Sequence, residues 1–329
     1  MTLFSRRSLV SIAGAALLVP LAGALPAHAQ SYPDHPVTIV VAWPAGGSHD
    51  LAARLVAEHL TKHMDATFVI KNVPGAAGST GVREVETAAP DGYTIGVMGL
   101  HAIAQSYMNP NATALDKIAP LAVFDKSPAA LTVGADTGID TLADFVAKAK
   151  EEPGAIVNST DGPGGFAFLT QMVMQNALGI ELTNIPYQGF APAVAAMASG
   201  ETMATTVNVA SAAPLMDAGS AKILGVAGTE RHFRVPEVPT FEEAGFPFVF
   251  ADFIGFFLPV GVDPAISTKL ETAMMATAAD PAFVEAARNA GLVLAPGGAA
   301  EFAAFIKAQD EAVYPVLEAA GLVEANARP

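Results

Sequence analysis

Residues 37–60 combine an apolar run, a turn with two glycines and the start of a helix, and this combination restricts the fold most. The run Val37–Ala42 is rich in β-branched residues, which favours a parallel strand covered on both faces. Gly46 and Gly47 follow it, and Asp50–Met64 has the pattern of a helix. We therefore expect an α/β sheet in which this helix directs free N–H groups toward an anion. The strand and the turn contain no Lys or Arg, so backbone amides would bind the anion.

The same order of strand, glycine turn and helix recurs later in the chain. Ala155–Ser159 is an expected strand, and Phe166–Leu178 is an expected helix after a second glycine-rich turn. A weaker third version at 205–211 places Asn208 and Ser211 on a further wall of a site, although Ser211 could equally cap a helix. Further strands are expected at 68–71, 94–98, 130–133, 223–227 and 255–259, and further helices at 79–88, 142–151, 191–198, 265–277, 281–290 and 300–319. This alternation predicts parallel sheets covered by helices, with ligands beyond the carboxyl ends of strands.

The first 29 residues have the composition of an export signal. Arg6 and Arg7 precede an Ala/Leu-rich stretch, and Ala27-His28-Ala29 is a small-residue cleavage pattern. Both the general secretory route and the twin-arginine route fit this segment. The chain has no cysteine, which excludes disulfides and thiolate chemistry. We expect an exported protein that is cleaved near Ala29.

The charge of the chain restricts its partners. The formal net charge is -15, and removal of Arg6 and Arg7 with no acidic residue lost gives -15 - 2 = -17. Nucleic acid is therefore not an expected partner. The same charge repels an anionic ligand at long range, so an anion site must act through local dipoles. No later segment reaches the roughly 18 apolar residues that a membrane span needs.

Several motifs, in chain order, resemble those of the solute receptors of tripartite tricarboxylate transporters, also called Bug receptors. The motifs are Pro44-Ala45-Gly46-Gly47 with Asp50, Asn72–Gly78, Ala89–Thr94, Pro186-Tyr187 with Gly189, and Pro236–Thr240 with Glu243-Ala244-Gly245. The resemblance extends over essentially all of the chain after the signal. It implies a protein of the periplasm with a type II periplasmic-binding-protein fold, in which two α/β domains enclose a ligand cleft.

The resemblance also implies a domain division and a function. Domain 1 would comprise residues 30–126 plus 250–329, and domain 2 residues 127–249. Such a receptor is a monomer without enzymatic activity, cofactor or metal. It captures a small organic carboxylate and delivers it to the integral-membrane permease subunits of its transporter. The expected ligand-binding residues are Trp43, Ala45, Gly46, Gly47, Ser48, His49, Asp50, His101, Ser159, Thr160, Asp161, Gly164, Gly165, Phe166, Tyr187, Phe190 and Asn208.

Individual roles follow for some of these residues. We expect Asp50 to brace the first loop and Asp161 to cap the helix that begins near Phe166. His101 is expected in a loop at the carboxyl end of the strand over 94–98, where it would face the cleft. Tyr187 is expected in the cleft because of the family resemblance.

This chain departs from the family pattern at several positions in the two loops. His49 stands where relatives carry small hydroxyl residues, and Trp43, Phe166 and Phe190 bring aromatic rings into the region. Aromatic contacts would suit an aromatic or otherwise bulky carboxylate. The alternative is that Trp43 and Phe166 pack between helix and sheet.

Two other readings of the sequence stay open. An exported α/β hydrolase could use Ser48 and His49, although the sequence has no G-x-S-x-G nucleophile motif. His59 and His63 have a spacing that can bind zinc, but no third ligand is evident. We expect them to be two histidines on the surface or the rim of the protein.

Overall fold

A computed structural model of the chain describes residues 32–324, so the expected export signal lies outside the described residues. The strands form two sheets. Sheet 1 has the order β11-β4-β10-β3-β1-β2, from β1 (Val37–Val41), β2 (Phe68–Asn72), β3 (Thr94–Met98), β4 (Ile118–Asp125), β10 (Ile254–Pro259) and β11 (Leu294–Gly297). Sheet 2 has the order β7-β6-β8-β5-β9, from β5 (Ala129–Gly134), β6 (Val157–Asp161), β7 (Thr183–Tyr187), β8 (Ala204–Asn208) and β9 (Ala221–Val226).

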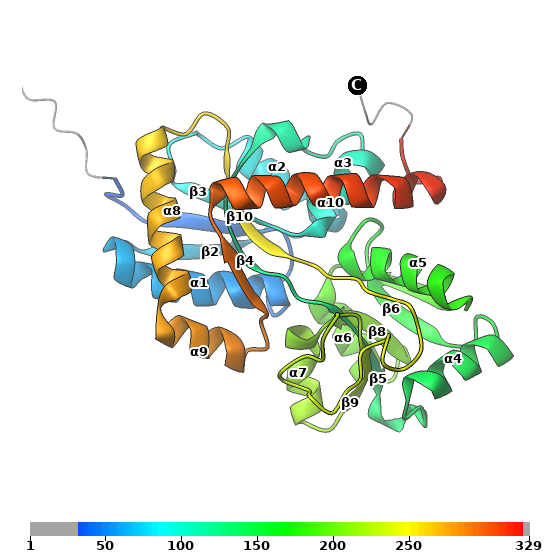
Figure 1. The fold of residues 1–329 in the computed structure, drawn as a ribbon. Helices are drawn as coiled ribbons and strands as arrows, with labels where there is room; N and C mark the ends of the chain where they lie inside the picture. Colours follow the sequence, from blue (N-terminus) through cyan, green and yellow to red (C-terminus); the bar gives the residue numbers. More distant parts are fainter. Residues whose placement is uncertain (1–31, 325–329) are drawn as a thin grey trace, which may run out of the picture. The chain divides into compact units, whose positions relative to one another are not determined.

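Helices cover both sheets (Figure 1). Those of sheet 1 are α1 (Ser48–Met64), α2 (Ser79–Glu86), α3 (Leu100–Met108), α8 (Pro264–Ala279), α9 (Pro281–Asn289) and α10 (Ala299–Ala319). Those of sheet 2 are α4 (Leu142–Glu151), α5 (Phe166–Leu178), α6 (Phe190–Ala198) and α7 (Val209–Asp217). We call each sheet with its helices a lobe. No helix within residues 32–324 is long and apolar enough to cross a membrane.

The strand β1 confirms the buried parallel strand predicted from its sequence. It pairs in parallel with β2 on one side and with β3 on the other, and four of its five residues are buried. A strand covered on both faces needs apolar side chains on both, which is why the run does not alternate. Its carboxyl end carries the chain into the glycine turn and α1.

The two sheets are mixed, which corrects the expectation of purely parallel sheets. In sheet 1, β10 runs antiparallel to β3 and β4, and in sheet 2, β5 runs antiparallel to β8 and β9. The reason lies in the connections. The chain passes directly from β4 into β5 and returns from β9 to β10, so β10 lies between β3 and β4 without a parallel crossover.

The sequence analysis did not predict three strands, β4, β7 and β11, or the helix α3. Prolines explain why β4 and β7 were not predicted. Pro120 lies within β4, next to a register shift opposite Phe256 and Phe257, and Pro186 lies in the edge strand β7. Proline is tolerated at bulges and edges because one ladder hydrogen bond is dispensable there. The short β11 and the helix α3 were also not expected.

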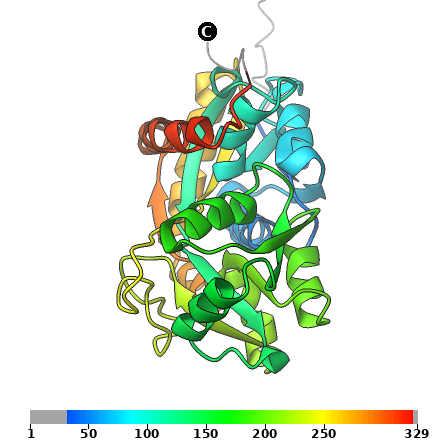
Figure 2. The same ribbon diagram turned by 90° about the vertical axis from the view of Figure 1, so that its right-hand side faces the viewer.

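Two segments connect the lobes and pair with each other. The first is residues 126–128 and the second is residues 227–253, a long segment without helix or strand beside β9 (Figure 2). The Asp252 N–H donates to the Ser127 carbonyl at 2.9 Å, and Ala129 N–H donates to the Phe250 carbonyl at 2.8 Å. The domain limits at 126/127 and 249/250 stay a prediction.

Gly96 in β3 offers a test of the packing of sheet 1. A Cβ atom there would lie 2.3 Å from ring carbons of Phe257, which faces it across the antiparallel pair. We predict that Gly96→Ala lowers the free energy of unfolding by about 1–3 kcal/mol, because the added methyl overpacks a buried site. Urea denaturation measures this change.

The matched control is Gly134→Ala, since Gly134 has a φ of -60° and a Cβ there would meet no atom closer than 3.5 Å. Its stability should stay the same or rise by about 0.4–1 kcal/mol. Equal stability of Gly96→Ala and the wild type would contradict the described packing.

Candidate functional site

The centre of the site is residues 43–50, which comprise the turn before α1 and the first residues of that helix, and we call this segment the first loop. Gly46 has a φ of 96°, a left-handed conformation that glycine adopts without strain. Helix α1 begins at Ser48, and Gly47 at its N-cap position provides no side-chain hydrogen bond. The N–H groups of the first turn therefore keep the capacity to bind an anion. This geometry agrees with the sequence-based prediction.

Asp50 braces the first loop, as predicted. Its carboxylate accepts hydrogen bonds from the Gly46 N–H, from the Arg54 guanidinium and from the Asn72 side-chain amide, each at 2.9 Å. Burial raises the pKa of Asp50, but these hydrogen bonds outweigh it and hold the pKa below its ordinary value. Asp50 is thus a charged structural support, with its oxygens already engaged.

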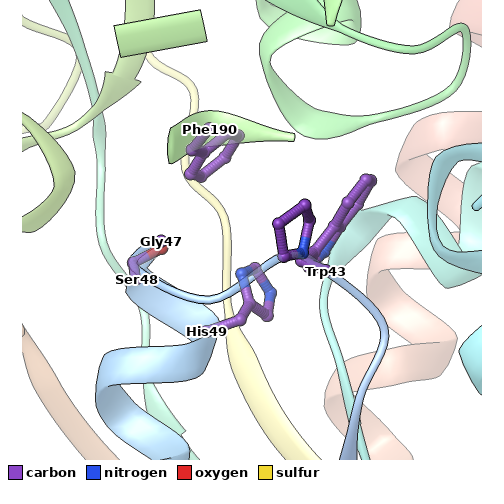
Figure 3. A pocket seen from close by; sticks show the side chains of 6 residues that line it. Trp43, Gly47, Ser48, His49 and Phe190 are labelled. Carbon is purple, nitrogen blue, oxygen red and sulfur yellow. The ribbon is translucent and has the colours of Figure 1, made fainter. Parts of the chain in front are cut away.

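A small pocket joins the first loop to the other lobe (Figure 3). Trp43, Pro44, Gly47, Ser48 and His49 line it from the first loop, and Phe190 lines it from the start of α6. The two lobes are in contact there, because a Cβ atom on Gly47 would lie 3.7 Å from the Phe190 Cβ. The cavity measures about 10 Å³, which is the space of one water molecule.

Asn208 forms a second direct connection between the lobes. Its side-chain amide donates to the Ser48 hydroxyl at 2.8 Å, and its side-chain oxygen accepts from the Ser211 N–H at 3.1 Å. Asn208 is fully buried; it caps α7 and also binds the first residue of α1. In the described part of the chain, the side chains of Ser48 and His49 form no hydrogen bond with each other. The arrangement that a serine nucleophile and its histidine base would need is therefore not present in this structure.

Residues 159–166 comprise the end of β6, the turn after it and the first residue of α5, and we call this segment the second loop. It does not line the pocket of the first loop. Asp161 accepts a hydrogen bond from the Phe168 N–H at 2.9 Å, which confirms that it caps α5, and burial raises its pKa to about 7. Gln105 of the other lobe donates to the Pro163 carbonyl at 2.6 Å. The second loop therefore faces α3 and not the pocket of the first loop. None of the residues of this loop that the sequence predicts to bind the ligand lines the pocket of the first loop; they are Ser159, Thr160, Asp161, Gly164, Gly165 and Phe166.

Phe166 and Tyr187, two of the predicted aromatic side chains, do not line the pocket, although the Phe166 ring lies 6.0 Å from that of Phe190. Phe166 is buried and stacks on Phe250 with ring centroids 5.5 Å apart, so it packs in the core and does not form a pocket wall. Tyr187 lies on the edge strand β7, and its hydroxyl donates to Glu201 at 2.8 Å. The direction of a side chain at the end of a strand depends on its neighbours, which a single sequence does not show.

His101 lies in the first turn of α3 and not in a loop, which corrects the prediction. Its ring packs edge-on against Trp43, with centroids 4.9 Å apart, and against His49 at 5.8 Å. It is buried behind the pocket wall. Burial and the neighbouring His49 lower its pKa well below the ordinary value, so the ring is neutral.

Sequence analysis missed a third loop at the contact between the lobes. Ala76 and Ala77 both have left-handed φ values, 45° and 48°, which are uncommon for residues with a Cβ. A Cβ on Gly162 of the second loop would lie 3.7 Å from the Ala77 Cβ. Strained residues of this kind gather at ligand-binding and switch regions. The glycines in Asn72–Gly78 were the available signal.

His59 and His63 do not form a metal site with other residues of the described chain. Both approach the Asp280 carboxylate, at 3.4 Å and 3.9 Å, where α1 packs against α9. His59 is only 5% exposed, so the expectation of two histidines on the surface or rim is wrong for His59. Its ring packs edge-on against Phe283.

Two α/β lobes linked by paired connections, with a pocket at the start of a helix, define a periplasmic-binding-protein fold. The sequence matches the model of the tripartite tricarboxylate transporter family receptor over residues 52–322. The chain therefore belongs to this family of solute-binding receptors, which are not enzymes.

Solved structures agree with this assignment. The chain is similar to the periplasmic binding protein BugD, with 26% identity and a TM-score of 0.85 over 89% of this chain and 99% of that one. It is similar to Rpa4515 of R. palustris, solved with adipate, with 26% identity and a TM-score of 0.85 over 89% and 99%. It is also similar to MatC of Rhodopseudomonas palustris, solved with bound malate, with 26% identity and a TM-score of 0.81 over 87% and 100%.

The role of Asp50 leads to a prediction about stability and pH. A carboxylate whose pKa is lowered by folding adds stability above its unfolded pKa of about 3.9, and this stability is lost as the pH falls through the folded value. We predict that Asp50→Asn costs about 1–3 kcal/mol at pH 7, because it disrupts a buried hydrogen-bond network. The difference in the free energy of unfolding between Asp50→Asn and the wild type should become smaller below about pH 4.

Urea denaturation at pH 7 and at pH 3 measures this difference. The exposed Asp136 forms no ion pair with any described residue, and Asp136→Asn is a suitable control with unchanged stability. If Asp50→Asn lowers the free energy of unfolding by the same amount at both pH values, the charge of Asp50 is not what stabilises the loop.

Proposed function

We propose that this protein is a periplasmic receptor that captures a small organic carboxylate at the first loop, between its two lobes. The observation that carries the proposal is the start of α1, which no side chain within residues 32–324 caps and on which Phe190 and Asn208 of the other lobe converge. Free N–H groups at a helix start bind carboxylates through both hydrogen bonds and the helix dipole.

The charges near the first loop support recognition by backbone amides. Arg54 is paired with Asp50 and is half exposed, so it does not reach the pocket as a free cation. A hydrogen bond from a backbone amide to a charged group contributes about 1.5–3 kcal/mol, so a few of them suffice against the cost of association. Adipate and malate, the molecules in two of the similar structures, are both carboxylates.

The walls of the pocket favour a ligand with an apolar or aromatic part. Trp43 and Phe190 face the cavity from opposite lobes, and each is less than 10% exposed. Their rings would contact a planar group, with about 0.5–1.5 kcal/mol per aromatic pair beyond the buried area. Since the cavity measures about 10 Å³, entry of such a ligand requires the lobes to separate, as in hinge-closing receptors.

The receptor would deliver its ligand to the membrane subunits of a tripartite tricarboxylate-type permease. The family assignment supports this partner. The periplasmic location follows from the similarity to periplasmic binding proteins and from the export signal expected in residues 1–29, with cleavage near Ala29.

A panel of carboxylates tests the ligand class. We predict that one or a few acids among C4–C6 diacids, citrate, amino acids, benzoate and phthalate raise the melting temperature. A ligand at 100 times its Kd stabilises by about 2.7 kcal/mol. A response to aliphatic diacids only would contradict the proposed aromatic wall, and no response to any carboxylate would contradict the receptor function.

Substitution of Gly47 can remove one backbone amide donor from the first loop. Its φ of -83° suits proline, and Gly47→Pro removes its N–H, whereas Gly47→Ala keeps it. We predict that Gly47→Pro weakens binding of the responding carboxylate about 10-fold or more, since one charge-assisted hydrogen bond is lost. Calorimetry on both variants measures this, with Gly47→Ala as the matched control. Equal affinity of the two variants would contradict the assignment of the first loop.

A further inference from the structure

Three buried ionisable side chains from three separate parts of the chain meet beside the pocket, and one of them, His49, also lines it. His49 comes from α1, His101 from α3 and Asp252 from the second connection between the lobes. They are 3%, 1% and 2% exposed. The His49 Nε2 and Asp252 Oδ2 atoms are 3.8 Å apart, and the two histidine rings are 5.8 Å apart.

Each of these side chains has a polar atom without a hydrogen-bond partner. Within the described part of the chain, His49 Nε2, His101 Nε2 and Asp252 Oδ2 are all buried and unpaired. The other Asp252 oxygen accepts from the N–H groups of Leu100 and Phe253 at 3.0 and 2.9 Å, so Asp252 caps α3. An unpaired buried polar atom destabilises the fold, so three of them in one cluster require an explanation, and a functional role is one.

Other charged groups lie near the cluster. Burial, and to a smaller extent the charge of Asp252, raises the pKa of the buried Asp125 of β4 and Asp161 of β6, and Lys126 lines a separate cavity that Asp252 also borders. Burial raises the pKa of Asp252, and the nearby His49 opposes this. Burial lowers the pKa of His49, which the Asp252 charge only partly opposes. His49 is therefore neutral while the pocket holds no anion.

His49 also lies in the first turn of α1, where the helix dipole opposes a positive charge. A carboxylate at this helix start would offset the dipole and add a second negative charge beside His49. We propose that His49 takes up a proton when the carboxylate binds, so that an imidazolium lies between the ligand and Asp252 and selects for a fully ionised acid. This inference rests on the proposed function.

Proton uptake has a definite sign. The free protein holds His49 neutral, and the complex favours its charged form, so the complex binds more protons than the free protein. By linkage, the affinity for an acid ionised throughout the range must rise as the pH falls from 8 toward 6, by up to about 10-fold per pH unit. His101 stays neutral, because burial and a charged His49 both act against its protonation.

Titration calorimetry of the carboxylate that responds in the panel tests the proposal. The titration is done at pH 8 and pH 6, in pairs of buffers with different ionisation enthalpies. The expected result is uptake of up to about one proton per ligand and tighter binding at pH 6. His49→Gln should bind with little pH dependence and without proton uptake. His35→Gln should behave as the wild type, since His35 is exposed and contacts Asp34 and Tyr93.

Binding of the wild type with no proton uptake and equal affinity at both pH values would overturn the inference and leave the proposed function standing. If no carboxylate binds at pH 8 or at pH 6, both the inference and the proposed function are overturned. If His49→Gln does not fold, the wild-type calorimetry still decides the question of uptake. The His49 ring followed by NMR in the wild type then assigns the proton, and a ring that stays neutral in the complex at pH 6 would overturn the role of His49.

Discussion

The hydrogen bond from the Gly46 N–H to the Asp50 carboxylate holds the first loop in the shape on which the rest of the site depends. A helix with a serine or aspartate at its N-cap position satisfies its own first N–H groups. Here glycine occupies that position, and the acidic residue lies three positions further on and reaches back to the loop. The loop is thus fixed while the start of α1 stays open to an anion. Arg54 and Asn72 keep Asp50 charged and engaged, so it does not compete for that place.

The site is complete only when both lobes contribute. Phe190 covers the first loop from α6, and Asn208 connects α7 to Ser48. At another contact between the lobes, Gln105 binds the backbone of the second loop. These contacts combine polar and apolar groups from both lobes, and they suit lobes that separate and close around a ligand. Asp252 lies at the centre of this arrangement, because it caps α3, pairs with Ser127 in the connection between the lobes and faces His49.

Local features of the fold and site could be predicted from the sequence, and features that depend on distant contacts could not. The strand β1, the glycine turn, α1 and the capping role of Asp161 each follow from neighbouring residues. The strands β4 and β7 contain prolines that are tolerated only because of a bulge and a sheet edge. Phe166 turns toward Phe250 and Tyr187 toward Glu201, which no local pattern indicates. Asp252 is 152 residues from the helix that it caps, and nothing in its own segment signals that role.

Trp43 is the only tryptophan of the chain, and it lines the pocket at the first loop. Its fluorescence therefore reports directly on the place where we propose that the carboxylate binds. Titration of the responding carboxylate should change the Trp43 emission in a saturable way, with the same Kd as calorimetry gives. An emission spectrum that stays unchanged while calorimetry records saturable binding would contradict the account, because the ligand would then bind away from the first loop.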